Sequence, residues 1–266
     1  MRLTKHHGLG NDFLVLLDLD GIRPITADDA VAACDRRAGI GADGILRVTA
    51  GQHGADVTME LRNADGSPAE MSGNGIRCLA QAVFQARLVP PPVLQVATAA
   101  GIRTVTVEAQ SDPHTHQMRV DMGAVKVVGA EPEWVDADVL QALRVDMGNP
   151  HVVLLWSAAA LPDRERLIAL GSQIDAVTPG GANVEVIAAD PDGHHVDMVV
   201  FERGVGPTMA CGTGACAAAA AAQEWGLCGT TVTVRMPGGP VQVTLGDPVV
   251  LSGAVTSVAR IETVWP

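Results

Sequence analysis

Basic residues are scarce in this sequence of 266 residues, and their scarcity limits the partners that the protein can have. The chain has 18 lysine and arginine residues against 30 aspartate and glutamate residues, which gives a formal charge of −12 at pH 7. A surface of this sign repels phosphate backbones and anionic lipid head groups. We therefore expect no nucleic-acid partner and no membrane partner, and we expect a small molecule as the ligand.

Long apolar runs are also absent. No stretch of 18 apolar residues could span a bilayer, and the segment Met1–His7 lacks the apolar core of a secretory signal peptide. These two features predict a cytoplasmic protein. Apolar residues still make up 47% of the chain and charged residues 18%, which favours a packed core over wholesale disorder.

The sequence has no CxxC pair. Its five cysteines are Cys34, Cys78, Cys211, Cys216 and Cys228. An odd number of cysteines in a reducing compartment predicts free thiols rather than a disulfide framework. Cys211 and Cys216 flank a glycine-rich turn without a second pair of ligands, so we expect no zinc site and no other structural metal. All the cysteines except Cys211 are interpreted as small apolar packing residues.

Two segments that follow glycine-rich turns are predicted to be helices. The first runs from Gly73 to Phe84, and the second runs from Gly212 to near Gly226 through an unbroken series of alanines. Alanine has the highest helix propensity, and a helix that is apolar nearly all round is a buried helix. Alternating or β-branched runs predict strands at Leu14–Leu17, Ile102–Glu108, Met118–Met122, Val152–Leu155, Val184–Ile187, Val196–Phe201, Thr231–Met236 and Pro240–Leu245. Many strands around two buried helices predict an α+β fold.

The two helix starts lie at matching distances from other polar residues, which indicates an internal duplication. Ser72 and Cys211 each directly precede a glycine turn and a helix. The residues that match in their offset from these two, to within one position, are Asn63 with Glu202, Asn11 with Asn149, and Asp43 with Asn183. Glycine and asparagine mark turns in any protein, which is the alternative explanation. Three matched offsets favour two similarly folded halves.

A polar segment near the middle of the chain, Gln110–Gln117, is predicted to be a linker between these halves. The predicted domains are therefore residues 1–112 together with 255–266, and residues 113–254.

Helix starts reached through glycines have a defined chemistry. They offer unpaired backbone N–H groups and the positive end of a helix dipole, so they bind carboxylates. A thiol in the same place is expected to gain acidity from the dipole. One acid–base group on each side of a bound α-carbon could remove a proton from one face and return one to the other, while the amides stabilise the enolate-like charge. This chemistry is racemisation or epimerisation without a cofactor.

Seven segments resemble the signature segments of the diaminopimelate epimerase family, in the family's order and spacing. They are His7–Phe13, Gly39–Gly44, Asn63–Ser67, Glu70–Arg77, Gly148–His151, Ala182–Glu185 and Glu202–Gly214. The resemblance implies two pseudo-symmetric α+β domains, each a mixed or antiparallel sheet wrapped around a central buried helix. It also implies a cofactor-independent homodimer of lysine and cell-wall precursor synthesis that interconverts LL- and meso-diaminopimelate with two cysteines.

The resemblance further assigns roles to single residues. Cys211 matches one catalytic cysteine, Ser72 stands at the position of the other, and His151 would lie near this pair. The substrate-binding residues that it implies are Asn11, Asn63, Gly73, Asn74, Asn149, Asn183, Glu202, Arg203, Gly212 and Thr213. Among these, the amides of Gly73, Asn74, Gly212 and Thr213 would hold the reacting carboxylate. The distal carboxylate would meet Asn63, Asn149, Asn183 and Arg203, whereas Glu202 would meet an ammonium group and Asn11 would line the site.

The sequence departs from the family pattern at three positions. Ser72 replaces a cysteine, Pro207 replaces a glutamate, and Gly44 replaces a residue that is polar in many members. A serine hydroxyl is a much weaker acid than a thiol, so it is a poor base and a better proton donor. Three explanations stay open for Ser72: a deliberate substitution, an enzyme that works asymmetrically with Cys211 as its base, or a neighbouring reaction. Pro207 removes a backbone donor and predicts a different setting of the loop before Cys211.

Three functions remain open at this point. The first is the epimerisation of diaminopimelate. The second is the racemisation, epimerisation or dehydration of another amino acid, such as histidine or hydroxyproline. The third is a catalytically silent protein that binds an amino acid.

Overall fold

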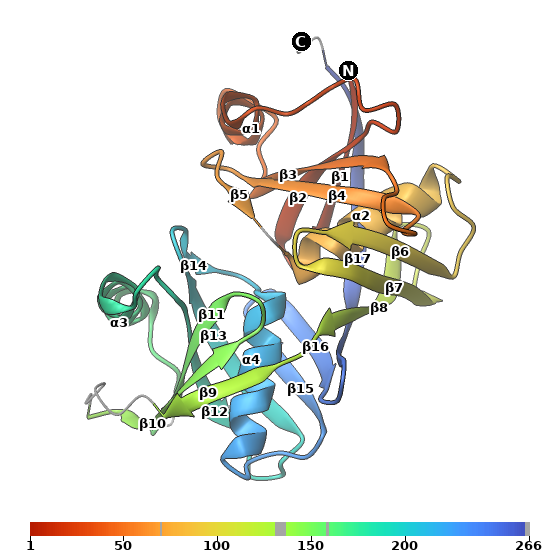
Figure 1. Ribbon diagram of the computed structural model, residues 1–266. Helices are drawn as coiled ribbons and strands as arrows, with labels where there is room; N and C mark the ends of the chain where they lie inside the picture. The colour runs from red at the N-terminus through yellow and green to blue at the C-terminus, as the bar shows by residue number, and fades with distance from the viewer. Residues whose placement is uncertain (70, 131–136, 158–159, 264–266) are drawn as a thin grey trace. The chain divides into compact units, whose positions relative to one another are not determined.

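The computed structural model describes residues 1–69, 71–130, 137–157 and 160–263. These residues form two compact units, which are described separately below (Figure 1). The first unit comprises Met1–Val120 and Gly253–Pro266, and the second comprises Asp121–Ser252. Strand β8 (Thr115–Gly123) and strand β17 (Val249–Glu262) each contribute residues to both units.

The first unit is built mainly of strands with two helices among its described residues. Its elements in chain order are β1 (Arg2–Gly8), β2 (Asn11–Leu17), α1 (Ala27–Cys34), β3 (Gly44–Ala50), β4 (Val57–Asn63), β5 (Pro68–Ala69), α2 (Gly73–Gln85), β6 (Val93–Thr98) and β7 (Gly101–Gln110), followed by β8. Strand pairs β2–β3 and β4–β6 are parallel, and the neighbouring pairs are antiparallel.

The second unit repeats this order. Its elements are β9 (Lys126–Ala130), β10 (Val139–Asp146), β11 (Pro150–Trp156), α3 (Arg164–Val177), β12 (Asn183–Ala189), β13 (His195–Glu202), β14 (Gly206–Thr208), α4 (Gly212–Glu224), β15 (Thr231–Met236) and β16 (Gly239–Thr244), followed by β17. Here β11–β12 and β13–β15 are the parallel pairs. Strands β10 to β17 therefore pair as β1 to β8 do, which confirms the predicted α+β fold of two pseudo-symmetric halves.

Helices α2 and α4 are the buried cores of their units. Residues Gly73–Val83 of α2 and Gly212–Ala222 of α4 are all buried, and Figure 1 shows α4 surrounded by strands. The alanine series of α4 explains this burial, because methyl side chains let strands approach the helix on every side. No helix in the described part of the chain is both long and apolar enough to cross a bilayer.

The segment predicted to be a linker is a turn instead. Residues 111–114 join β7 to β8, and the two strands pair as a hairpin in which Gln110 lies opposite His116. The polar and proline residues that suggested a linker are explained by this exposed turn. Residues 113–120 and 253–254 accordingly lie with the first unit, unlike in the sequence-based division at 112/113 and 254/255.

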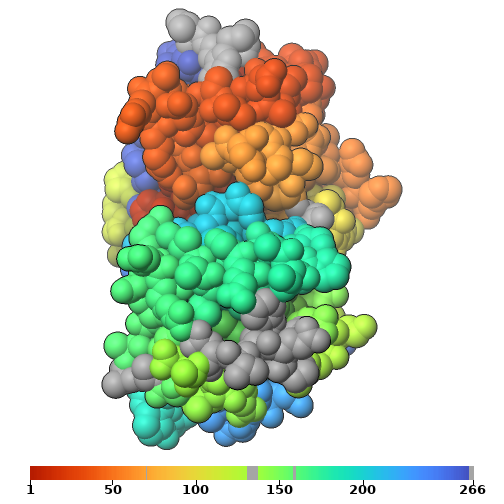
Figure 2. Space-filling model, turned by 90° about the vertical axis from the view of Figure 1, so that its left-hand side faces the viewer, coloured from red at the N-terminus to blue at the C-terminus, as the bar shows by residue number. Residues whose placement is uncertain are grey.

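Helix α3 covers an apolar face of the second unit, and a glycine sets its distance from the sheet. Leu167, Leu170 and Ile174 pack with Phe201 in one buried cluster. A Cβ atom added at Gly171 would lie 2.2 Å from Cγ of Phe201 and 2.5 Å from its Cβ. The green segment that includes α3 forms much of the face of this unit seen in Figure 2. Gly171 is therefore required by close packing rather than by backbone conformation.

We predict that Gly171→Ala destabilises the protein although alanine is the better helix former. The overpacked methyl group costs about 1–3 kcal/mol, against a gain of up to about 1 kcal/mol in helix propensity. The matched control is Ser172→Ala, at an exposed position of the same helix. Urea unfolding should give a lower midpoint for Gly171→Ala only, and equal midpoints for the two variants would contradict the packing argument.

Candidate active site

Ser72 begins α2 with its side chain turned back onto the helix. It is the N-cap, with φ −141° and ψ 118°, and its Oγ accepts a hydrogen bond of 3.0 Å from the Gly75 amide. This contact leaves the hydroxyl hydrogen available to an outside acceptor, because the oxygen lone pair is used as the cap. The cap thus holds the Ser72 hydroxyl at the start of α2.

Cys211 begins α4 in the same way. It is the N-cap, with φ −128° and ψ 118°, and its Sγ accepts from the Gly214 amide at 3.4 Å. Its Sγ also lies 3.5 Å from Oγ1 of Thr213. The thiol and the Ser72 hydroxyl therefore occupy equivalent positions in the two halves, as the matched offsets predicted.

The first turn of each helix has the features of an anion site. Gly73 and Asn74 follow Ser72, and Gly212 and Thr213 follow Cys211. The first N–H groups of a helix have no acceptor within the helix, and they coincide with the positive end of its dipole. These four residues can each offer an amide to a carboxylate.

In the first unit, a series of side-chain hydrogen bonds fixes the orientation of Asn74. Nη2 of the fully buried Arg77 donates to Oδ1 of Asn74 at 2.6 Å. Nδ2 of Asn74 then donates to Oδ1 of Asn11 at 3.2 Å, and Nδ2 of Asn11 donates to Oδ2 of Asp43 at 2.9 Å. Sequence reasoning placed Asn11 and Asn74 in the site but missed Arg77, which follows Asn74 by three residues and so lies one helical turn away.

An ionic cluster around Asp43 and Asp12 holds the far end of this series of hydrogen bonds. Arg36 contacts Asp12 and Asp43, each at 2.6 Å, and Nζ of Lys5 lies 2.8 Å from Asp12. Burial alone would raise the pKa of Asp12, but the hydrogen bonds from Arg36 and Lys5 outweigh it and hold that pKa below its usual value. Asp12 therefore stays charged, and the hydrogen bond from Nδ2 of Asn11 to Asp43 keeps the Asn11 amide oriented.

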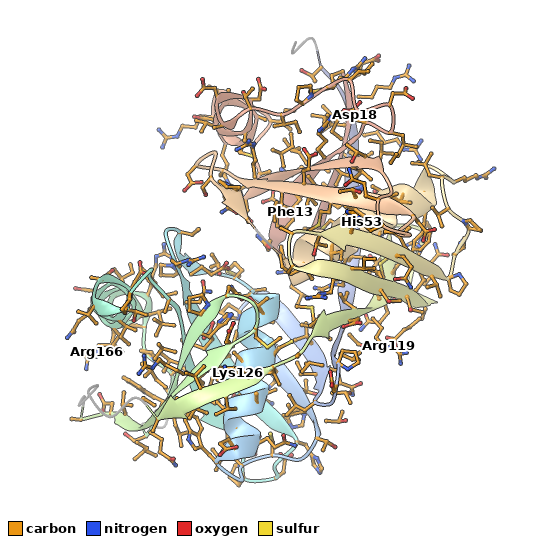
Figure 3. All side chains as sticks on the ribbon, viewed as in Figure 1. Phe13, Asp18, His53, Arg119, Lys126 and Arg166 are labelled. Carbon is orange, nitrogen blue, oxygen red and sulfur yellow. The ribbon has the colours of Figure 1, made fainter. Side chains whose placement is uncertain are left out.

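Asn63 ends β4 opposite Gly44, one of the positions at which the sequence departs from the family pattern. Nδ2 of Asn63 donates to Oγ of Ser67 at 3.1 Å, and Gly44 is its partner across β3 and β4. A Cβ atom at Gly44 would lie 2.8 Å from the carbonyl oxygen of Arg62 and 3.1 Å from the ring of Phe13, which is labelled in Figure 3. The Phe13 ring thus fills the space that a side chain at residue 44 would need.

In the second unit, Asn183, Arg203 and Glu202 lie around the ends of β12 and β13. Oδ1 of Asn183 accepts from the Arg203 amide at 3.0 Å, and Nη1 of Arg203 donates to the Gly180 carbonyl at 3.1 Å. Arg203 is exposed, so its guanidinium can meet a ligand. Thr208 donates its hydroxyl hydrogen to Oε1 of Glu202, which fixes that carboxylate.

The proline at 207 leaves this hairpin intact. Pro207 lies in β14 opposite Phe201 of β13, between the paired positions on either side. The loop ahead of β14 is closed by the Val205 amide, which donates to the Glu202 carbonyl at 3.0 Å. The hairpin thus forms with proline at this position.

His151 is buried against a carboxylate that sequence reasoning did not assign. Nδ1 of His151 lies 2.8 Å from Oε1 of Glu185, and Nε2 lies 3.0 Å from Oδ1 of Asn149. The side chains of His151 and Glu185 are both fully buried. The signal that could have found Glu185 is a lone acidic residue in an otherwise apolar strand.

The electrostatic surroundings of Cys211 differ from the expectation. Burial raises its pKa well above the usual value, and the charges of Glu202 and Glu185 raise it further. The contacts with Thr213 and the Gly214 amide lower the pKa but do not compensate. The prediction of a more acidic thiol is therefore wrong in its net direction, because burial and two carboxylates outweigh the helix start.

The remaining cysteines are packing residues. All five cysteines are free thiols, and Cys34, Cys78 and Cys216 are buried whereas Cys228 is half-buried. Burial raises the pKa of Cys34 to about 11 and that of Cys78 to about 12, so both remain protonated at neutral pH.

One surface group among the described residues could hold a metal ion. Ligand atoms of Asp190, Asp192 and His195 lie within 4.8 Å of one another. Asp192 also accepts from the amide of His194 at 2.8 Å. The three side chains lie at or near the surface, where acidic groups commonly gather without an ion.

The chain is similar in sequence to diaminopimelate epimerases. The sequence profile of the family described as diaminopimelate epimerase matches residues 3–128 and 143–257. A diaminopimelate epimerase of Corynebacterium glutamicum is 44% identical over 255 residues, which cover 92% of this chain and 91% of that protein. A diaminopimelate epimerase of Mycobacterium avium is 40% identical over 269 residues, which cover 93% and 91%.

Solved structures share the fold at low identity. A hydroxyproline epimerase from Agrobacterium vitis with bound trans-4-hydroxy-L-proline matches with a TM-score of 0.75 and 17% identity, over 98% of this chain and 91% of that one. A phenazine biosynthesis protein of Bacillus anthracis matches with a TM-score of 0.70 and 15% identity, over 100% and 99%. Profile and identity together establish that this chain belongs to the diaminopimelate epimerase family.

Proposed function

We propose that this chain interconverts LL- and meso-diaminopimelate without a cofactor, with Cys211 and Ser72 as its two acid–base groups. The observation that carries the proposal is the equivalence of these residues as N-caps of α2 and α4, each accepting from the amide three residues later. The relatives at 40–44% identity are named for the same substrate. One bound substrate has to contact both helix starts for this reaction.

The proton transfers follow from the two side chains. The thiolate of Cys211 would remove the α-hydrogen as a proton. The electron pair of the broken C–H bond would then be delocalised into the carboxylate. The amides of Gly73, Asn74, Gly212 and Thr213 would stabilise that charge. The Ser72 hydroxyl would deliver a proton to the opposite face and must then regain one from solvent. In the reverse direction Ser72 would have to act as a base, which is the slower step.

The rest of the substrate would meet the polar side chains around these turns. We assign the distal carboxylate to Asn63, Asn149, Asn183 and Arg203, because an exposed guanidinium suits a carboxylate. Glu202 would bind an ammonium group, Asn11 would line the site through its contact with Asn74, and His151 would act from beneath Asn149.

The proposal also includes a homodimer in the cytoplasm that needs no cofactor. The homodimer and the independence of a cofactor come from the family resemblance. They complete the assignment as an enzyme of lysine and cell-wall precursor synthesis.

The first prediction separates the two faces of the reaction. In deuterated water, Cys211→Ala should abolish exchange of the α-hydrogen, whereas Ser72→Ala should keep exchange with retention of configuration and lose interconversion. Ser72→Cys, assayed with reductant, should raise the rate of interconversion on the order of 10²-fold, as a positioned acid–base group does. Cys216→Ala, a buried cysteine of the same helix α4, is the control. Undiminished exchange in Cys211→Ala would contradict the assignment.

The second prediction concerns the choice of substrate. Arg203→Gln should raise KM for diaminopimelate about tenfold to a hundredfold, because a charge-assisted hydrogen bond is lost. Arg235→Gln, which breaks a surface ion pair with Asp197 in the same unit, should leave KM unchanged. The assays use diaminopimelate, histidine and hydroxyproline. Turnover of a monocarboxylate in preference to diaminopimelate would favour a racemase of another amino acid, and binding without exchange would favour a silent binding protein.

The third prediction follows from the raised pKa of Cys211. A raised pKa leaves little thiolate at neutral pH, so alkylation of Cys211 by iodoacetamide should accelerate as the pH rises towards that pKa. Glu202→Gln removes one of the charges that raise the pKa, and it should move the profile to lower pH. The rate is measured by mass mapping of the Cys211 peptide. A profile that stays in place or moves to higher pH would contradict this electrostatic account.

A further inference from the structure

The buried pair formed by His151 and Glu185 has no polar counterpart in the first unit. Glu185 is the third residue of β12, and Leu46 is the third residue of β3, the equivalent strand. Each lies 26 residues before the N-cap of the buried helix, Cys211 or Ser72. The first-turn glycine of each helix faces the same position: an added Cβ would lie 3.6 Å from Cδ2 of Leu46 at Gly75, and 2.5 Å from Oε1 of Glu185 at Gly214.

The same equivalence relates His151 to Phe13. Phe13 pairs with Gly44, the first residue of β3, and His151 pairs with Asn183, the first residue of β12. Phe13 is 3% exposed and Leu46 is 0% exposed, so the first unit fills these positions with apolar side chains. A buried ion pair stabilises a fold no better than well-packed apolar residues do. Packing therefore does not explain why the second unit has histidine and glutamate here.

The contacts of His151 define which of its nitrogens carry hydrogen. Its Nδ1 faces an oxygen of Glu185, and its Nε2 faces the side-chain oxygen of Asn149. A carboxylate and a carboxamide oxygen both act as acceptors, so both ring nitrogens have to donate. A ring that donates from both nitrogens is an imidazolium, and the fully buried Glu185 is the carboxylate placed to balance it.

The hydrogen bond between His151 and Oδ1 of Asn149 affects which group Asn149 can offer to a ligand. When Oδ1 accepts from Nε2 of His151, the Nδ2 group of Asn149 is left to donate elsewhere, and the half-buried Asn149 can reach a ligand. An NH₂ group binds a carboxylate, whereas the flipped amide would present an oxygen and repel it.

We propose that Glu185 is a positioning residue: it keeps His151 doubly protonated, and His151 in turn orients Asn149 to donate to a substrate carboxylate. This inference rests on the proposed function for the identity of the substrate only. The helix start above Glu185 supports its charge, because Gly214 has no side chain to separate the carboxylate from the positive end of α4.

The test uses the full-length protein with Glu185→Gln, which keeps the size of the side chain and removes its charge. Glu224→Gln, at an exposed position of α4, is the charge control. Nitrogen-15 spectra of the histidine rings are recorded at about pH 8, where an ordinary imidazole is neutral. A His151→Gln variant assigns the signal among the eight histidines. We expect a doubly protonated His151 in the wild type and in Glu224→Gln, and a neutral ring in Glu185→Gln.

Binding of meso-diaminopimelate, measured by calorimetry, provides the second readout. Glu185→Gln and Asn149→Ala should each weaken binding about tenfold to a hundredfold, and the double variant should be no weaker than Asn149→Ala, because both changes remove one interaction. Additive losses would indicate a merely structural role and overturn the proposal. A neutral His151 in the wild type would also overturn it, whichever amino acid binds. A wild type that shows the charged ring but no binding of diaminopimelate would count against the proposed function instead.

Discussion

The structure depends on one local interaction that occurs twice: the side chain of an N-cap residue accepts a hydrogen bond from the third amide of a buried helix. This contact fixes the reactive atom of Ser72 and of Cys211 to the helix start. It also keeps the amides of the first turn turned outward, where they can hold a carboxylate. The glycines that follow each cap let other groups approach these amides. In each unit, the reactive side chain and the amides that can bind an anion thus belong to the same helix start.

The rest of each unit serves to hold that element in place. Strands surround α2 and α4, whose residues Gly73–Val83 and Gly212–Ala222 are all buried, and the same pairing order is used in both units. The units differ in what lies beneath the helix start. The apolar Leu46 lies next to Gly75 in the first turn of α2. Glu185, which contacts His151, lies next to Gly214 in the first turn of α4. The asymmetry in charge therefore lies on the side of the thiol, where burial and the charges of Glu202 and Glu185 raise the pKa of Cys211.

The sequence predicted the parts of the structure that have a local signal. Helix α2 was expected over 73–84 and spans Gly73–Gln85, and the strand expected at Val184–Ile187 lies within β12. Strand β1 was missed because a polar residue, His6, occupies one of its buried positions and breaks the alternation of apolar and polar residues. In the structure, Nδ1 of His6 lies 2.8 Å from Oε1 of Gln81, which gives the buried ring a hydrogen-bond partner. Helix α3 was missed because Gly171 interrupts its apolar face for the sake of Phe201. The domain boundary was displaced because the turn of a hairpin has the composition of a linker.

Candidate site residues could be named from spacing and motif, whereas their contacts in the folded chain could not all be inferred. Glu185 contacts His151 from a strand 34 residues further along the chain, whereas Arg77 contacts Asn74 from one turn further along the same helix. A crystal structure of the full chain with bound meso-diaminopimelate tests the central claim most directly. The account predicts that one α-carbon lies within reach of both Sγ of Cys211 and Oγ of Ser72, with its carboxylate on the amides of residues 73, 74, 212 and 213. A substrate whose α-carbon contacts only one of these two side chains, with its carboxylate away from the helix starts, would contradict it.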